Sequence, residues 1–299
     1  MPFPDKIALI GFGEVGRIFA ADLKARGVGL SAYDPLFARD GSGPSQAVAQ
    51  AGIEACASAP EAARGAQLVI SAVTAAQALK AARSVIGGLD ASAFFLDLNS
   101  ASPGVKIAAS KAIDAGGGRY VEAAVMSSVP PKGLKTPMLL GGPHADDFLA
   151  LAGPLELDAR VFAQEVGLAS ATKMCRSVMI KGVEALLAEC LLTARRYGVE
   201  KTVLGSLSDM LPNPDWERHA RYMLSRSLLH GKRRAEEMRE VARTVEEAGI
   251  EPLMSTAAAR RQDWAYDLAR QLPAGMIEEP DLGRLLDAMR ALIEAEADA

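Results

Sequence analysis

The hydrophobic positions of this chain follow two different patterns. Before residue 165 they form short apolar runs of the kind that buried parallel strands need, at 7–10, 29–33, 68–73, 93–98, 120–125 and 138–140. Alanine-rich segments that favour helix lie between several of these runs, at 15–24, 60–64 and 75–85. Repeated strand–helix–strand units predict a doubly wound α/β sheet with helices on both faces.

Beyond residue 165 the apolar residues recur at helical spacing. The longest segment of this kind spans 168–197 without a proline, and four more follow at 216–229, 233–248, 255–271 and 282–297. Most of the 27 glycines precede residue 165, and glycine is a poor residue inside helices. We therefore expect an α/β domain at 1–164 and an all-α domain at 165–299.

Composition narrows the class of protein without changing this picture. The chain has 299 residues, 49% of them hydrophobic, and a formal net charge of −4. A disordered chain would be more charged and less apolar, and three widely spaced cysteines, which we expect in the core, make no disulfide framework. The mild acidity favours neither nucleic acid nor a membrane as partner, and the sequence has no secretion signal or membrane-spanning apolar stretch. A cytoplasmic protein is the expectation.

A glycine-rich motif follows the first apolar run directly and opens a helical segment. It reads Gly-x-Gly-x-x-Gly and consists of Gly11, Phe12, Gly13, Glu14, Val15 and Gly16. In this setting Gly11 permits the tight turn, Gly13 lets the backbone approach a pyrophosphate, and Gly16 lets the helix pack close to the strand. The helix start adds amide donors and a partial positive charge for the phosphates. The motif predicts a dinucleotide site; the alternative is a glycine-rich turn in a fold that binds no nucleotide.

An acidic residue follows the second apolar run, where dinucleotide folds need one. Asp34 comes directly after the run 29–33. A carboxylate at this place accepts hydrogen bonds from the ribose hydroxyls and repels a 2′-phosphate, which favours NAD over NADP. Arg39 lies five residues further on and offers a cation that would weaken this preference, so NADP stays open. The alternative for Asp34 is a solvated loop acid.

Later segments make the chain resemble the β-hydroxyacid dehydrogenases, the family of 3-hydroxyisobutyrate and 6-phosphogluconate dehydrogenases. Residues 70–74, which end in Val73 and Thr74, resemble the family's segment near the cofactor after the fourth strand. Residues 97–103 resemble Asp-x-Ser-Thr-x-Ser-Pro, with Ser100 at the hydroxyl that in the family approaches the nicotinamide ribose. The resemblance implies a Rossmann-type NAD(P)-binding domain, a helical substrate and dimerisation domain, and a homodimer.

Two segments depart from the family's pattern. Where the family has Asp-Ala-Pro-Val-Ser-Gly-Gly, residues 122–128 read Glu-Ala-Ala-Val-Met-Ser-Ser, so Met126 replaces a serine of the substrate segment. Either Ser127 takes over substrate binding one position along, or Ser127 is a turn residue and the pocket accepts another group. The family's lysine on the long helix is present as Lys173, but the asparagine one turn later is Ser177. This combination resembles a divergent branch of the family with its own C-terminal helical domain.

The resemblance implies that Lys173 is the catalytic acid and base; without the resemblance, the alternative is a surface lysine on a helix. Hydride transfer to or from an alcohol needs a group that exchanges the hydroxyl proton, and burial beside a cationic nicotinamide disfavours an ammonium group. Ser177 or Arg176 would orient the substrate or the lysine from the next turn; the alternative for Ser177 is a helix serine bonded to its own backbone. Lys173, Ser177, Lys181 and Glu184 recur at helical spacing, and we expect this polar stripe to line a wet cleft.

A basic segment at 230–234 has two interpretations. Lys232 or Arg233 matches a family lysine near cofactor and substrate, or the segment is a solvated helix face paired with Glu236 and Glu237. The three histidines lack partners at ligand spacing, so we expect no metal.

The expected function is hydride transfer between NAD, with NADP possible, and a small β-hydroxy acid or related alcohol. Two alternatives stay open, an imine reductase and an NAD-binding sensor or structural dimer without turnover. Imine reductases usually lack the lysine, so Lys173 argues against the first. The departures at Met126 and Ser177 leave room for the second.

Overall fold

The computed structural model describes residues 4–207 and 215–297, and these residues form two compact units. The first unit spans Met1–Cys175 and the second spans Arg176–Ala299. The units therefore meet inside the long helix α7 (Leu168–Tyr197), further along the chain than residue 165, where composition changes. The reason is that the first turns of α7 pack on the sheet, as described below.

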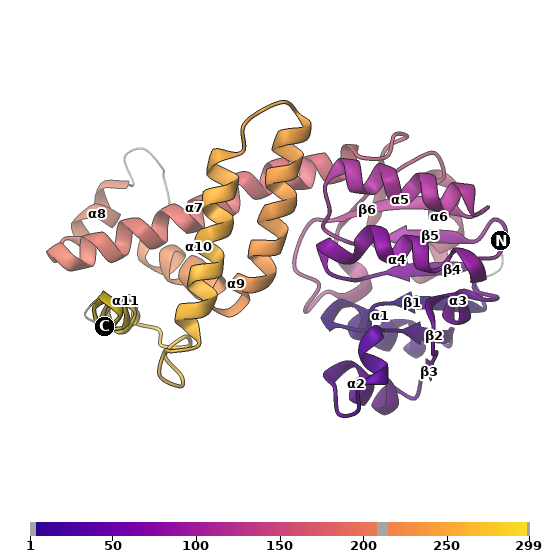
Figure 1. Ribbon diagram of the computed structural model, residues 1–299, viewed down its shortest axis with the longest axis horizontal. Coiled ribbons are helices and arrows are strands. Elements are labelled where there is room, and N and C mark those ends of the chain that lie inside the picture. Colours follow the sequence, from indigo (N-terminus) through magenta and orange to yellow (C-terminus); the bar gives the residue numbers. More distant parts are fainter. Residues whose placement is uncertain (1–3, 208–214, 298–299) are drawn as a thin grey trace. The chain divides into compact units, whose positions relative to one another are not determined.

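An eight-stranded sheet forms the centre of the first unit, in the order β3-β2-β1-β4-β5-β6-β7-β8. Figure 1 labels the strands from β3 to β6 in this order. The strands are β1 (Lys6–Ile10), β2 (Gly29–Tyr33), β3 (Glu54–Ala55), β4 (Leu68–Ser71), β5 (Phe94–Asp97), β6 (Arg119–Val125), β7 (Met138–Gly141) and β8 (Ala159–Ala163). All neighbours are parallel except β6 and β7. The connection from β6 to β7 contains no crossover helix, so it returns the chain antiparallel. The doubly wound α/β fold that the apolar runs predict is confirmed.

Helices cover both faces of the sheet because alternate strand residues point to opposite sides. The flanking helices are α1 (Glu14–Ala25), α2 (Gly43–Ala51), α3 (Ala59–Ala63), α4 (Ala78–Ser84), α5 (Pro103–Ala115) and α6 (Ala145–Ala152). On one face, Ile7 and Leu9 of β1 share a core with Phe19 of α1. On the other face, Ala8 and Ile10 pack with residues of α3, α4 and α5. Both faces of β1 are therefore buried, which is why its residues 7–10 are continuously apolar.

The second unit consists of helices around a separate apolar core. It contains most of α7, and then α8 (Glu200–Leu207), α9 (Trp216–Glu247), α10 (Leu253–Ala269) and α11 (Leu282–Ala297). Leu191 of α7, Leu224 of α9 and Leu285 of α11 are among the buried residues of this core. Helices α9 and α10 lie side by side as a hairpin (Figure 1). The predicted all-α region is confirmed.

Two details of the helical unit differ from the sequence-based expectation. The segments 216–229 and 233–248 are not separate helices, because α9 continues through Gly231. A side chain at Gly231 would bring its Cβ to 2.5 Å from the Gln262 carbonyl oxygen of α10, so this glycine serves close helix packing rather than a break. Of the cysteines expected in the core, Cys56 is buried but Cys175 is exposed.

Candidate functional site

The glycine motif forms the turn between β1 and α1, at the carboxyl edge of the sheet. Gly11 has φ +94°, and a Cβ there would lie 2.4 Å from the Ala72 carbonyl oxygen. A Cβ at Gly16 would lie 2.2 Å from the Gly11 carbonyl oxygen. Both positions therefore require glycine, the first for its backbone conformation and both for close approach. These are the roles that the sequence assigned to the first and third glycines.

Gly13 is different, because a Cβ at this position would meet no protein atom within 4 Å. Protein packing therefore does not require glycine here, whereas a ligand lying against the backbone would. Gly13 is also the N-cap of α1 and has no side chain to bond the first amide groups of the helix. Beside it, Phe12 is buried against Phe37, Glu14 is exposed and Val15 is half-buried. The residues of this turn fit the pyrophosphate of a dinucleotide.

Asp34 holds the same turn from the end of β2. Its Oδ2 accepts the Phe12 amide hydrogen at 2.9 Å, and its Oδ1 accepts the Leu36 amide hydrogen at 2.9 Å. The carboxylate is half-buried, and each oxygen keeps a second acceptor direction. The sequence suggested a ribose ligand or a solvated loop acid for Asp34, and it gave no sign that Asp34 ties the glycine turn to the segment after β2.

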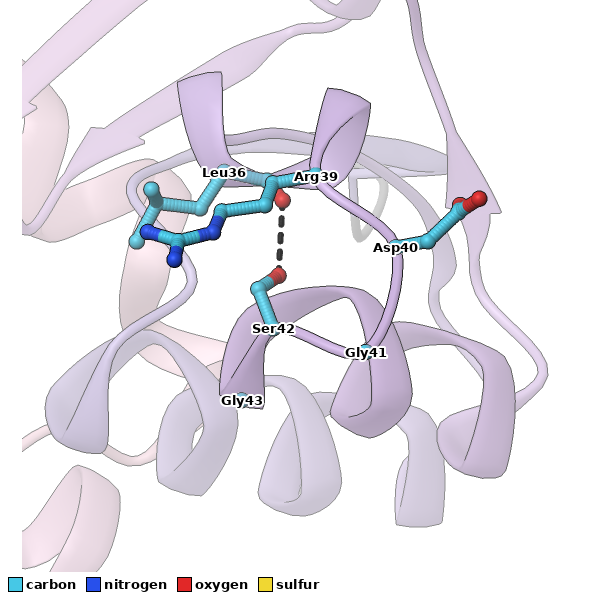
Figure 2. Close-up of a pocket in the computed structure, with 6 residues that line it drawn as sticks. All are labelled: Leu36, Arg39, Asp40, Gly41, Ser42 and Gly43. Carbon is cyan, nitrogen blue, oxygen red and sulfur yellow. Dashed lines mark hydrogen bonds between the residues drawn. The ribbon is translucent and has the colours of Figure 1, made fainter.

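A cavity of about 370 Å³ lies beyond Asp34 in the chain, between the end of β2 and the start of α2 (Figure 2). Its lining residues are Leu36, Arg39, Asp40, Gly41, Ser42 and Gly43. The Ser42 hydroxyl donates to the Leu36 carbonyl oxygen at 2.7 Å and also caps α2. Arg39 and Asp40 are exposed on this cavity, so it carries one charge of each sign.

On the other side of the glycine turn, Asn99 fixes the segment that follows β4. Its Oδ1 accepts the Val73 amide hydrogen at 2.7 Å, and its Nδ2 donates to Ser71 Oγ at 2.9 Å. Val73 is half-buried and Thr74 is exposed. Because β1 and β4 are neighbours from which the chain winds in opposite directions, this is the switch point at which doubly wound sheets bind ligands.

A buried ionic network lies beneath the next segment, 98–102. Asp97 accepts from Lys106 Nζ at 2.9 Å and from the Tyr120 hydroxyl at 2.8 Å, and its Oδ1 also accepts the Asn99 amide hydrogen at 2.9 Å. Asp97, Lys106 and Tyr120 are all fully or almost fully buried. Burial, together with the charge of Asp97, raises the pKa of Tyr120 well above its ordinary value. The network fixes the backbone that leads to Ser100, and sequence reasoning missed it.

Ser100 and Lys173 meet although 73 residues separate them. The Lys173 Nζ atom donates to Ser100 Oγ at 2.7 Å, and both side chains are partly buried. Ser100 follows β5, and Lys173 lies in the second turn of α7. Two residues that the family resemblance singled out thus form one contact within the first unit.

The start of α7 is attached to β6 through Glu122. The Glu122 carboxylate accepts the amide hydrogens of Gly167 at 2.7 Å and Ser170 at 2.6 Å, and it is fully buried. Ala169 packs with Ala124 and Leu139 of the sheet, and Met126 packs against them. These contacts explain why the first turns of α7 belong to the sheet unit.

Ser127 and Ser177 have less defined surroundings. Ser127 is exposed, and its hydroxyl lies 3.5 Å from the carbonyl oxygen of the next residue, as in a turn. Ser177 is half-buried and lies one turn beyond Lys173 on α7. The surroundings of Ser127 and Ser177 neither support nor contradict the substrate role that the sequence suggests for them.

The far part of the predicted polar stripe does not line a cleft. Lys181 and Glu184 are buried inside the helical unit, where Lys181 Nζ lies 2.7 Å from Glu237 Oε2 and Glu184 pairs with Arg234. Burial lowers the pKa of Lys181 even though Glu237 opposes the shift. Because buried charges need partners, α9 supplies one for each, and the expectation of a wet cleft is wrong for these two residues. Arg233 pairs with Glu237 at 3.0 Å, as the solvated-face interpretation predicts.

Comparison with known families gives two matches, one in each unit. Residues 6–152 match the NAD-binding domain of 6-phosphogluconate dehydrogenase. Residues 194–265 match a domain of unknown function, DUF1932.

Solved structures similar to the whole chain agree with these matches. The conserved hypothetical protein from Sinorhizobium meliloti 1021 is 36% identical, with 95% of this chain and 96% of that chain covered and a TM-score of 0.74. A conserved protein of unknown function, described as structurally similar to 3-hydroxyacid dehydrogenases, is 34% identical over 89% of this chain and 98% of its own, with a TM-score of 0.68. A 3-hydroxyisobutyrate dehydrogenase from Mycobacterium tuberculosis shares the fold at 17% identity. The match covers 96% of this chain and 99% of that chain, with a TM-score of 0.69.

The doubly wound sheet, the glycine turn and these matches define an NAD-binding protein of the dehydrogenase type. The chain belongs to the family that joins the NAD-binding domain of 6-phosphogluconate dehydrogenase to a DUF1932 domain, a branch of the β-hydroxyacid dehydrogenases. The resemblance found in the sequence is confirmed.

Metal-ligand clusters and membrane-spanning helices are both absent from the described residues. Among residues 4–207 and 215–297, no three histidine, cysteine, aspartate or glutamate side chains gather as a metal site would require. Within the same ranges, every helix is too short or too polar to cross a membrane.

Proposed function

We propose that this protein is an NAD(P)-dependent oxidoreductase that transfers a hydride between the nicotinamide and a small β-hydroxy acid or related alcohol. The observation that carries the proposal is the contact of Lys173 Nζ with Ser100 Oγ, 2.7 Å apart in the unit that holds the glycine turn. A lysine near the carboxyl edge of a dinucleotide-binding sheet is placed for proton exchange with a substrate held at that edge.

In this proposal the residues of the first unit hold the cofactor. Gly11, Gly13 and Gly16 would receive the pyrophosphate at the start of α1, and Asp34 would bind the adenosine ribose. Val73, Thr74 and Ser100 would lie along the rest of the cofactor. The nicotinamide supplies the hydride chemistry when bound. Asp34 favours NAD, while the exposed Arg39 offers a cation to the extra phosphate of NADP.

Lys173 performs the proton chemistry. Its amine accepts the hydroxyl proton when the alcohol is oxidised, and its ammonium returns a proton to the oxygen in the reverse direction. The Ser100 hydroxyl accepts a hydrogen bond from Nζ and so limits the directions in which the lysine can point. Ser177 and Ser127 are proposed to orient the substrate.

We propose further that the enzyme is a homodimer assembled through its helical unit. Exposed apolar side chains recur seven residues apart, at Met179 and Leu186 of α7 and at Tyr222 and Leu229 of α9. This spacing gives each helix an apolar face of the kind that partner subunits cover. Sedimentation of the purified protein tests the assembly, and a monomer at micromolar concentration would contradict it.

Turnover of a panel of hydroxy acids and alcohols, followed by NADH and NADPH absorbance, tests the reaction. Lys173→Ala should lower kcat by roughly 10²- to 10⁴-fold and leave NAD affinity nearly unchanged. Lys111→Ala, which removes an exposed lysine of α5 in the same unit, is the matched control and should change neither. Unchanged turnover in Lys173→Ala would overturn the mechanism. Cofactor binding without reaction on any substrate would instead favour a sensor.

A further inference from the structure

Glu122 is a fully buried acid whose two side-chain oxygens accept hydrogen bonds from backbone amides. Both carboxylate oxygens accept from the start of α7, one from Gly167 at 2.7 Å and the other from Ser170 at 2.6 Å. The amides at a helix start lack partners within the helix and carry partial positive charge, so they stabilise an anion there. Hydrogen bonds to a charged group are also stronger than those between neutral groups.

The packing around this carboxylate leaves it little freedom. A Cβ at Gly141 of β7 would lie 2.7 Å from Glu122 Oε2, so the missing side chain provides the space for the carboxylate. On the helix side, Gly167 has φ +108° and faces Pro103 and Ile107 of α5, 3.4 and 3.5 Å from where its Cβ would be. The start of α7 thus packs against β7 and α5 on its inner side, while Leu168 on its outer side is exposed.

Glu122 and Asp97 are neighbours in register on β6 and β5. Asp97 accepts the Asn99 amide hydrogen and so fixes the segment that carries Ser100. Glu122 fixes the turn that precedes Lys173. Two adjacent acids of one sheet therefore hold the two backbones whose side chains meet at 2.7 Å.

We propose that Glu122 is the positioning residue for Lys173. It sets where α7 begins, and through the rigid helix it sets the distance from Lys173 Nζ to Ser100. Glu122 contacts neither substrate nor cofactor in this proposal, which rests on the proposed function of Lys173. A displacement of about 1 Å at a reacting group lowers turnover by roughly 100-fold, so the effect of losing this anchor is large enough to measure.

The test uses Glu122→Gln in the full-length protein. Glutamine keeps the length of the side chain but offers only one acceptor oxygen, so an NH₂ group must face one of the two amide donors. Hydrogen exchange in peptides spanning 165–175 should become roughly tenfold faster or more, while peptides from α1 stay unchanged. This measurement needs no activity. The control is Asp281→Asn, at a helix cap remote from Lys173 in the chain. This change removes the charge of an exposed carboxylate that accepts the Arg284 amide hydrogen at the start of α11.

Turnover then separates positioning from stability. Glu122→Gln should lower kcat by roughly 10- to 100-fold and shift its pH profile, with the KM for the cofactor within about threefold of wild type. Asp281→Asn should change none of these. Gly141→Ala gives a second variant, because its methyl group displaces the carboxylate while keeping the charge, and the same direction of change is expected.

Unchanged exchange at 165–175 in both Glu122→Gln and Gly141→Ala would overturn the inference. So would faster exchange with unchanged kcat and pH profile in an active enzyme. A wild-type protein without turnover contradicts the proposed function instead, and the exchange data distinguish that result from failure of the anchor.

Discussion

The Cα atom of Gly16 faces the Gly11 carbonyl oxygen so closely that a Cβ at residue 16 would lie 2.2 Å from it. Gly16→Ala must therefore push α1 away from the turn. We expect the variant to lose about 1–3 kcal/mol of unfolding free energy in the absence of any ligand. Urea denaturation measures this loss.

Gly13→Ala is the matched variant in the same turn. The added methyl group meets no atom beyond its chain neighbours within 4 Å, but alanine is a poorer N-cap than glycine, so the loss of unfolding free energy should be at most about 1 kcal/mol. Affinity for NAD should nevertheless fall roughly tenfold or more, because the methyl group occupies the surface at which the backbone meets the pyrophosphate. Equal NAD affinity in Gly13→Ala and wild type would show that the turn does not receive phosphates.

Asp34 has two roles that one substitution can separate. Asp34→Asn removes the charge that repels a 2′-phosphate and leaves one acceptor oxygen for the amides of Phe12 and Leu36. The ratio of NADPH to NADH affinity should rise roughly tenfold, as measured by fluorescence titration. Asp40→Asn changes an exposed acid on the neighbouring cavity and is the control. An equal loss for both cofactors would mean that Asp34 only holds the turn.

Tyr120 gives the protein a defined sensitivity to alkaline pH. Burial and Asp97 raise the pKa of Tyr120 well above its ordinary value of 10.0 in the folded state. Between pH 10.0 and this raised pKa, the tyrosine of the unfolded chain loses a proton that the folded protein keeps. The stabilisation that Tyr120 gives the folded protein is complete below about pH 10 and declines as the pH rises further.

Comparison of wild type with Tyr120→Phe isolates this contribution. Wild type should be more stable by about 1–3 kcal/mol near neutral pH, since the variant leaves a buried acceptor of Asp97 without its donor. This difference should narrow by up to about 1.4 kcal/mol per pH unit above about pH 10. A difference that is constant from about pH 8 to about pH 11.5 would contradict the prediction.

Gly231 and Gly182 should respond oppositely to alanine. A methyl group at Gly231 would lie 2.5 Å from the Gln262 carbonyl oxygen, so Gly231→Ala should cost about 1–3 kcal/mol although alanine is the better helix former. Gly182, in α7, has no protein atom within 4 Å of such a group, and Gly182→Ala should gain about 0.5–1 kcal/mol. Thermal unfolding of the two variants measures both effects. Destabilisation by Gly182→Ala would show that helix propensity does not determine the effect of a substitution at residue 182.

Much of the fold could be predicted because apolar patterns report burial directly. The run at 29–33 and the long helix at 168–197 have the predicted bounds. Strand β8 was missed because it lies at the sheet edge, where its residues alternate between exposed and half-buried and form no apolar run. Helix α9 was divided in two because a glycine in a sequence does not reveal whether a neighbouring backbone approaches it.

Part of the candidate site could be predicted from motif spacing and from the family resemblance. The glycine turn was predicted from its spacing, and Lys173 was singled out only by the resemblance. Glu122 was not, because its partners are backbone amides, which every residue except proline carries and which no sequence pattern marks. The pairing of Asp97 with Lys106 and Tyr120 depends in the same way on strand register, which brings distant residues to one point. A buried acid in an otherwise apolar run was the available signal for both Asp97 and Glu122.

The space that Gly141 leaves for Glu122 links the histories of two positions. A side chain at residue 141 needs space that the Glu122 carboxylate occupies, so it displaces Glu122 unless residue 122 is shorter. Whether a mutation at one of these positions is tolerated therefore depends on the residue at the other. The order in which the two mutations occur matters for the same reason. The two residues face each other on neighbouring antiparallel strands, so a change at one position alters which side chains fit at the other.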